Sequence, residues 1–156
     1  MKGGFMKRRE AREQAFKFLY QIQVQTDDIP AQREYFLRSC RDEFGFEDAD
    51  ISYITGVVDG VIKETAEFDR QISTCLKKWT VDRLPCVDLA ILRLALYEIK
   101  YEHVAFSIIA NEAVLLAKKY STEESRSYIN GILGKLMPKE DEQSVKDMAE
   151  TEADEV

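Results

Sequence analysis

Four side chains near the start of the chain have types and spacing suited to binding an anionic polymer. They are Arg8, Arg12, Phe16 and Tyr20, which follow one another at intervals of four residues. On a helix this spacing places them in one slowly drifting row, beside the apolar stripe rather than on it. Arginine binds phosphate with two parallel hydrogen bonds and stacks on bases, and an aromatic ring adds a stacking platform. The row predicts contact with single-stranded RNA; the alternative is a solvated basic terminus plus two core aromatics.

The distribution of charge supports an anionic partner for this end of the chain. The net charge of the 156 residues is −7, which alone argues against nucleic acid. Residues 1–12, however, hold five basic residues against one acid, and residues 139–156 hold eight acids against two lysines. Most of the acidity therefore lies in a terminal segment that need not touch the folded body. We expect residues 1–6 to be a flexible extension and residues 139–156 to be a disordered acidic tail.

The inventory of catalytic and metal-binding residues is poor. The only histidine, His103, falls in an expected loop, and no phosphate-binding loop or nucleophile motif occurs. Glu98 and Glu112 lie in mostly apolar segments, where they either bond arginine or backbone groups or form an acid pair with a raised pKa. The three cysteines form no CxxC pair and are expected to be buried hydrophobes: Cys40, Cys75 and Cys86. The sequence therefore predicts a binding protein without enzymatic activity, cofactor or metal.

Hydrophobic periodicity predicts an all-α domain over residues 7–138 and no strand of convincing length. The expected segments are the stripe from Ala11 to Ile22, a helix from Asp28 to Gly45, the stripes 51–62 and 68–79, the nearly all-apolar 87–99, and helices before Tyr120 and Pro138. A segment that is apolar all round belongs at the centre of a bundle, so we expect 87–99 there. No run of about 18 apolar residues and no secretory signal is present, which predicts a cytoplasmic protein.

Local signals predict several details of these helices. Pro30 suits the first turn after Asp28, and Gly45 suits a helix end. Ser107 is expected to cap the sixth helix, and Ser121 with Glu124 to form a capping box for the seventh. Gly56 and Gly60 are one turn apart and each costs about 1 kcal/mol of helix propensity, so close helix packing is expected at both.

Four separated blocks of the chain resemble the NusB family of bacterial transcription antitermination factors. The blocks are AREQAFKFLY at 11–20, VDLAILRLALYEI at 87–99, NEAVLLAKKY at 111–120 and SRSYINGIL at 125–133. They occur in the order and at the spacing of the family, and the resemblance covers about residues 7–138. It implies an all-α fold of about seven helices in two small packed helical bundles.

The resemblance also implies a function and a set of contact residues. It implies binding of boxA-containing single-stranded RNA of ribosomal RNA transcripts, jointly with the small-subunit ribosomal protein NusE, within the RNA polymerase antitermination complex. The residues at the implied RNA-binding positions are Lys7, Arg8, Arg9, Arg12, Glu124 and Tyr128. The implied partner-binding positions are Tyr20 and Asp88, with Asp88 also favourably placed at a helix amino terminus. We expect Asp88 to serve the protein partner rather than the core.

The chain departs from the family pattern at a few positions. Ala105 stands where proline is usual, and Ser127 stands where lysine is common, so one phosphate contact is expected to be missing. Two alternatives remain open. One is an RNA-targeting module like that of some rRNA cytosine methyltransferases, although a chain ending soon after Pro138 is expected to hold no catalytic domain. The other is a helical protein-interaction module or homodimer that binds no RNA.

Overall fold

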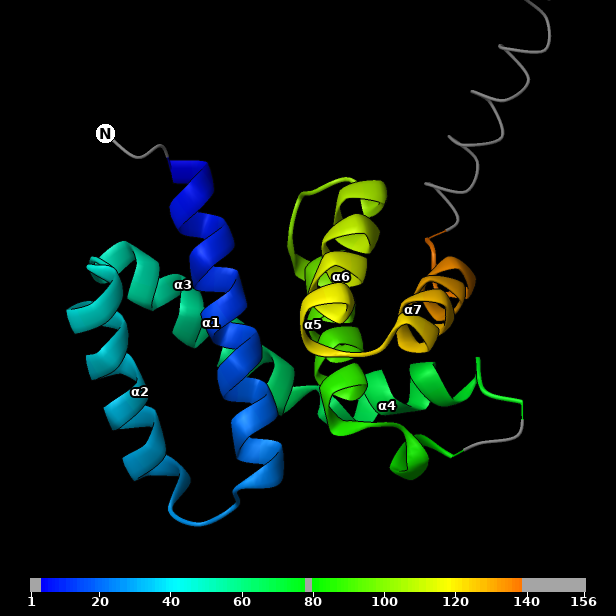
Figure 1. Ribbon diagram of the computed structural model, residues 1–156, viewed down its shortest axis with the longest axis horizontal. Coiled ribbons are helices and arrows are strands. Elements are labelled where there is room, and N and C mark those ends of the chain that lie inside the picture. Colours follow the sequence, from blue (N-terminus) through cyan, green and yellow to red (C-terminus); the bar gives the residue numbers. More distant parts are fainter. Residues whose placement is uncertain (1–3, 78–79, 139–156) are drawn as a thin grey trace, which may run out of the picture.

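The computed structural model describes residues 4–77 and 80–138, and their regular structure is helical (Figure 1). The elements are α1 (Gly4–Val24), α2 (Ile29–Phe44), α3 (Asp48–Lys63), α4 (Thr65–Ser73), the short 3-10 helix η1 (Val81–Arg83), α5 (Cys86–Tyr101), α6 (Phe106–Tyr120) and α7 (Glu123–Lys135). The prediction of an all-α chain without strands is confirmed for the described residues. Helix α1 begins inside the segment expected to be an extension, and the predicted acidic tail lies outside the described residues.

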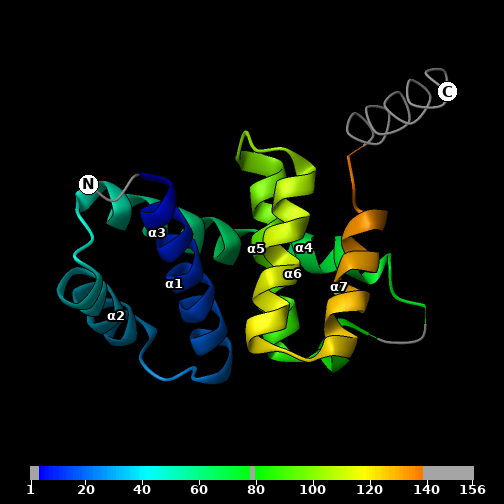
Figure 2. The same cartoon turned by 45° about the horizontal axis from the view of Figure 1, so that its top comes forward.

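The helices form two small groups that meet along α1 and α5. Helices α1, α2 and α3 make one group, and α4 to α7 make the other (Figures 1 and 2). Helix α1 packs on α3 within the first group and on α5 across the boundary, while α5 also packs on α3, α4, α6 and α7. The nearly all-apolar segment 87–99 therefore lies at the centre, as its composition predicted. None of the described helices is long and apolar enough to cross a lipid bilayer.

Both ends of α2 follow from local sequence. The Asp28 side chain accepts a hydrogen bond from the Ala31 backbone N–H at 3.2 Å, and Pro30 occupies the first turn. At the other end Gly45 has a φ of 63°, and its N–H donates to the Arg41 carbonyl at 3.1 Å. Glycine adopts this left-handed conformation without a steric penalty, so the predicted helix end is confirmed.

The predicted caps of α6 and α7 are each displaced by one or two residues. Helix α6 begins at Phe106 with Ala105 as its N-cap, so Ser107 already lies inside the helix. The N-cap of α7 is Thr122, whose hydroxyl accepts from the Ser125 backbone N–H at 3.1 Å. Ser121 is the C-cap of α6 and not the N-cap of α7, and its hydroxyl donates to the Asp88 carboxylate at 2.7 Å. A tertiary contact therefore decides how this serine is used.

Close packing explains one of the two glycines of α3. A Cβ added to Gly60 would clash with the Tyr97 ring, with Cδ2 at 3.0 Å and Cζ at 3.2 Å. Gly60 therefore lets α3 and α5 approach each other, as predicted. At Gly56 an added Cβ would meet nothing within 4 Å, so the same prediction is wrong there.

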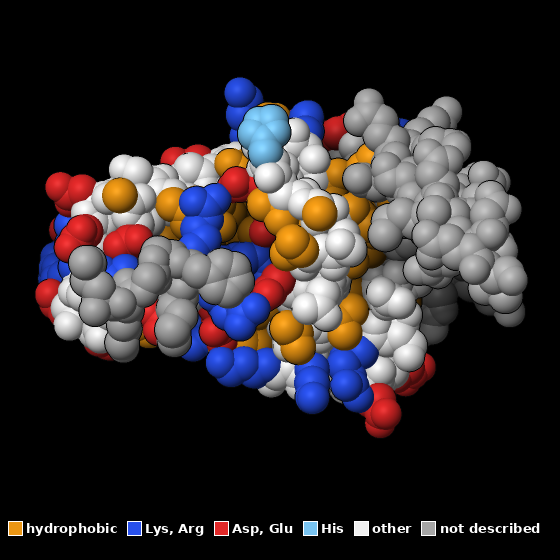
Figure 3. Space-filling model, turned by 90° about the horizontal axis from the view of Figure 1, so that it is seen from above, with side chains coloured by type: hydrophobic (Ala, Val, Ile, Leu, Met, Phe, Trp, Pro, Cys, Tyr) orange, Lys and Arg blue, Asp and Glu red, His pale blue; other side chains and the backbone are white. Residues whose placement is uncertain are grey.

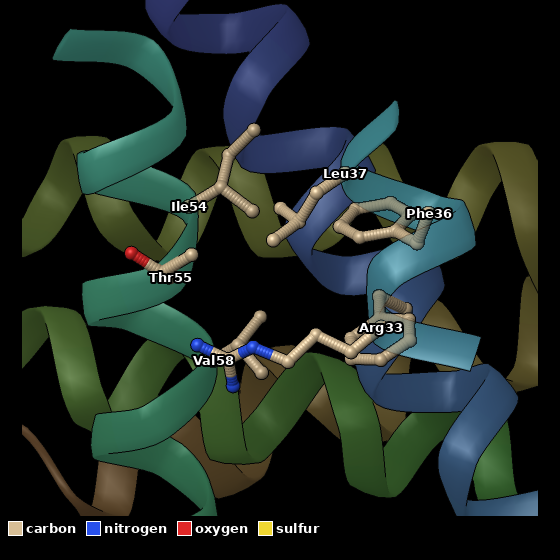
Figure 4. Close-up of a pocket in the computed structure, with 7 residues that line it drawn as sticks. Arg33, Phe36, Leu37, Ile54, Thr55 and Val58 are labelled. Atoms are coloured by element: carbon tan, nitrogen blue, oxygen red, sulfur yellow. The ribbon is translucent and has the colours of Figure 1, made fainter. Parts of the chain in front are cut away.

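The interior of the first group is packed core rather than a binding site. The Phe18 and Phe36 rings stack with centroids 4.6 Å apart, joining α1 to α2. Figure 4 shows Phe36 and Leu37 of α2 facing Ile54 and Val58 of α3. The Arg33 stem extends along this contact, and its guanidinium donates to the Asp59 carboxylate, with Nη2 3.0 Å from Oδ2. Functional side chains must therefore be sought on the outside and at the junction of the two groups.

Candidate nucleic-acid interface

The amino-terminal part of α1 carries two exposed arginines, Arg8 and Arg9, which lie near the α5–α6 connection. Both side chains are 53% exposed, and each makes an ion pair with a helix or loop of the second group. The Arg8 Nη2 atom lies 2.9 Å from Glu102 Oε2, and the Arg9 Nη2 atom lies 2.6 Å from Glu112 Oε1. Figure 3 looks onto this end of the molecule, where basic side chains alternate with acidic and apolar ones. Exposed arginines held in this way remain accessible to a phosphate.

Arg12 is placed differently, because it is buried in the junction between the two groups. Its Nε and Nη2 atoms donate to the two Glu98 carboxylate oxygens at 2.8 Å and 2.7 Å. The Phe16 ring is also buried and lies 5.2 Å from the Tyr120 ring. The prediction of one surface row is therefore wrong at these two positions, because the side of α1 that packs on the second group includes them. Tyr20 is 39% exposed and lies on the surface.

The Arg8 guanidinium also lies over an aromatic ring. Its Cζ atom is 3.8 Å from the centroid of the Tyr53 ring, which comes from α3. Burial, followed by the nearby Glu98 carboxylate, raises the pKa of Tyr53 to about 12, so the phenol is neutral near pH 7. A small hollow of about 110 Å³ opens here, lined by the three arginines, three glutamates and apolar side chains of this region: Arg8, Arg9, Arg12, Tyr53, Glu98, Glu102, Val104, Ile108, Ile109 and Glu112.

A basic and aromatic seam between α1 and α6 was missed by the sequence analysis. The Nζ atoms of Lys17 and Lys119 lie 5.8 Å and 5.4 Å from the centroid of the Tyr120 ring. Glu13 accepts hydrogen bonds from the Tyr120 hydroxyl and from Lys119, the latter at 2.5 Å. The KKY run that ends α6 could have indicated a basic and aromatic surface, but only the folded chain brings Lys17 beside it.

Glu124 and Tyr128 lie in the first turns of α7. Glu124 is exposed, whereas the Tyr128 ring is half-buried against the core. The Tyr128 hydroxyl oxygen is buried and has no hydrogen-bond partner among the described residues. Burial, followed by the charge of Asp88, raises the pKa of Tyr128 to about 12. The ring therefore contacts the core while remaining partly exposed.

Asp88 is completely buried, so the prediction that it serves a surface rather than the core is wrong. Its two carboxylate oxygens accept hydrogen bonds from the Ser121 and Ser125 hydroxyls, both at 2.7 Å. The exposed fraction of Asp88 is 0%. The cause is the connection between α6 and α7, which folds over the amino terminus of α5 and covers the carboxylate.

The residues assigned to RNA binding fall into two separate groups along α5. Arg8 contacts Glu102 just beyond the carboxyl end of α5. Ser125 of α7 instead donates a hydrogen bond to Asp88, which lies at the amino end of α5. At about 1.5 Å per residue, these two ends are roughly 20 Å apart. A nucleic acid that touches both groups must therefore be several nucleotides long.

The remaining candidate residues are two glutamates, the histidine and the three cysteines. Glu98 and Glu112 bond arginines, which confirms the structural interpretation of both. His103 is exposed (Figure 3), and Cys40 and Cys75 are buried, whereas Cys86 is exposed and not the buried residue that was expected. The described ranges hold no group of three or more metal-binding side chains.

Comparison with known proteins identifies relatives over most of this chain. The sequence model of the NusB family matches residues 9–138. The chain is 44% identical over 133 residues to transcription antitermination protein NusB of Acetivibrio thermocellus, covering 85% of this chain and 89% of that one. It is 39% identical to the protein of the same name from Ruminiclostridium cellulolyticum, covering 84% and 88% of the two chains.

Solved structures show the same fold. The structure of T. maritima NusB superimposes with a TM-score of 0.76 at 32% identity, covering 92% of this chain and 99% of that chain. A structure of the antitermination factors NusB and NusE in complex with dsRNA gives a TM-score of 0.70 at 26% identity, covering 83% and 94%. Since the family match spans nearly the whole described helical body, the chain belongs to the NusB family.

Proposed function

We propose that this protein is a cytoplasmic, non-enzymatic transcription antitermination factor. It binds boxA-containing single-stranded RNA of ribosomal RNA transcripts together with the ribosomal protein NusE. Within the RNA polymerase antitermination complex it promotes processive rRNA transcription. The observation that carries the proposal is the likeness to the chain solved with NusE and dsRNA, combined with exposed arginines at the start of α1.

The proposed RNA surface begins at the amino-terminal part of α1. Lys7, Arg8 and Arg9 supply cations there, and exposed basic side chains account for most nucleic-acid affinity. Lys17 and Lys119 continue the basic surface along the α1–α6 seam. Both guanidinium nitrogens of Arg12 that face Glu98 are occupied, so we assign Arg12 a supporting role beneath this surface.

The proposal assigns α7 to the other end of the RNA strand. There the half-exposed Tyr128 ring offers a stacking surface, and the Glu124 carboxylate lowers affinity by repelling phosphates. The exposed Tyr20 is the proposed contact for the protein partner. Asp88 affects these surfaces only indirectly, by holding Ser121 and Ser125 in place.

The test is a gel shift with boxA RNA over a range of salt concentrations, with and without NusE. Replacing Arg8 and Arg9 with alanine removes two phosphate contacts, so the slope of log affinity against log salt flattens by about 1.4. The matched control replaces Arg38 and Arg41, which are also exposed and ion-paired but lie on α2. The control variant keeps the parental slope, because α2 lies outside the proposed surface. Duplex RNA of the same sequence distinguishes single-strand from double-strand binding.

Two outcomes contradict the proposal. If R8A/R9A binds boxA RNA as tightly as the parent at every salt concentration, the RNA site lies elsewhere. If the parent binds NusE or itself but no RNA, the chain is a helical protein-interaction module or homodimer.

A further inference from the structure

Arg8 is held from two sides by residues of two different helical groups. The Tyr53 ring of α3 lies under the face of the guanidinium, with the ring centroid 3.8 Å from Cζ. Glu102, which follows α5, binds one guanidinium nitrogen, Nη2, at 2.9 Å. A planar group fixed on one face and at one nitrogen has a defined orientation.

This arrangement leaves hydrogen-bond donors of the guanidinium available. Among the residues that the structure describes, none bonds the Nε or Nη1 atom of Arg8, and half of the side chain is exposed. Arg12 provides the contrast, since Glu98 occupies its Nε and Nη2 atoms and the side chain is buried. Arg8 therefore has donors that can reach a phosphate while its orientation is already fixed.

Preorientation of this kind increases affinity. A long arginine side chain loses conformational freedom when it binds a phosphate, and a side chain that is already ordered loses less. The Tyr53 ring supplies the ordering contact through attraction between the cation and the π-electrons of a neutral phenol. Glu102 alone would fix only one nitrogen and would bring a negative charge near the phosphate.

We propose that Tyr53 is a positioning residue for RNA binding: its ring holds the Arg8 guanidinium in an orientation in which the donors that Glu102 leaves unbonded reach an RNA phosphate. The inference rests on the proposed RNA-binding function and adds a residue of α3 to it. RNA affinity thereby depends on the contact between the two helical groups, because Tyr53 and Glu102 belong to different ones.

The test measures boxA RNA affinity and its salt dependence for the full chain carrying Tyr53→Leu, Tyr53→Phe or Arg8→Lys. Tyr53→Leu removes the ring and weakens binding about two- to fivefold, while Tyr53→Phe keeps the ring and binds like the parent. Arg8→Lys keeps the charge but lacks the planar group, so it weakens binding in the parent and has a smaller effect in the Tyr53→Leu background. Tyr35→Leu, at an exposed tyrosine on α2, is the matched control and leaves RNA affinity unchanged.

The outcomes distinguish failure of the Tyr53 inference from failure of the proposed RNA-binding function. An equal loss from Tyr53→Leu in the parent and in an Arg8→Ala background shows a general structural effect and overturns the inference. An equal loss from Tyr53→Phe and Tyr53→Leu overturns it as well, because the hydroxyl would then be responsible. Arg8→Lys replaces an exposed side chain, so it tests the contact between Arg8 and Tyr53 even if Tyr53→Leu lowers the stability of the fold. A parent chain that binds no RNA overturns the proposed function, and this inference with it.

Discussion

Arg12 and Glu98 form a buried ion pair with two hydrogen bonds, and this pair joins α1 of the first helical group to α5 of the second. The bonds measure 2.8 Å and 2.7 Å, and the two side chains are 8% and 9% exposed. Removing one partner leaves an uncompensated charge in the core, which costs much more than loss of a surface pair. The pair is the most buried ion pair between the two groups among the described residues.

Glu98→Gln or Arg12→Ala should therefore lower the free energy of unfolding by about 3–5 kcal/mol. Arg38→Ala, which breaks an exposed pair with Glu34, should change it by less than about 1 kcal/mol. Urea unfolding followed by circular dichroism measures both. Similar values for the buried and the exposed pair would contradict the assigned role of Arg12.

Asp88→Asn should destabilise the protein, because the carboxylate accepts two hydroxyl hydrogen bonds in the core. An amide retains only one acceptor oxygen, so we expect a loss of about 1–3 kcal/mol. Asp82→Asn, at an exposed aspartate of η1, is the control and should have no measurable effect. Thermal unfolding distinguishes them, and parental stability of Asp88→Asn would show that the two serine contacts contribute nothing.

Substitution of the two α3 glycines by alanine should have opposite effects. Gly56→Ala gains helix propensity without a clash and should raise the free energy of unfolding by up to about 1 kcal/mol. Gly60→Ala forces the Tyr97 ring to move, and overpacking should destabilise by about 1–3 kcal/mol. The two variants are compared by urea unfolding, and equal stabilisation by both would mean that the Tyr97 ring moves aside without cost.

Tyr128→Phe removes a buried hydroxyl oxygen that has no partner among the described residues. We expect parental or slightly higher thermal stability, because a buried polar group without a hydrogen bond is unfavourable. If the ring stacks on a base, Tyr128→Phe keeps RNA affinity, while Tyr128→Ala loses about 1–3 kcal/mol of binding energy. Weaker RNA binding by Tyr128→Phe would assign the contact to the hydroxyl instead.

The Glu13 carboxylate should make the free energy of unfolding depend on pH in the acid range. Burial alone would raise the pKa of Glu13, but hydrogen bonds from Lys119 and Tyr120 outweigh it and lower the pKa below its ordinary value of 4.5. The unfolded chain then takes up this proton first, so the contribution is complete above pH 4.5 and is lost as pH falls below it. Glu13→Gln should show a smaller loss of unfolding free energy between about pH 5 and pH 3. Glu34→Gln, the same charge change at an exposed site, should keep the parental dependence.

The helical class, the central place of α5 and both ends of α2 could be predicted from the amino-acid sequence. These features depend on local preferences: a repeated apolar pattern, an aspartate that caps its own helix and a glycine in the left-handed conformation. The family resemblance, carried by four blocks of sequence, is likewise a property of the chain alone, and the match over residues 9–138 confirms it.

Contacts between distant parts of the chain determine which polar side chains are buried. The four-residue spacing placed Arg12 on a surface row, and the family resemblance placed Asp88 on a partner surface. Both are instead buried by residues far along the chain. Glu98 is 86 residues from Arg12, and Ser125 is 37 residues from Asp88. Helical periodicity gives the position of a side chain around its own helix but not the partner that covers that side. A charged residue at the edge of an apolar stripe is exposed or buried according to whether a distant donor or acceptor meets it.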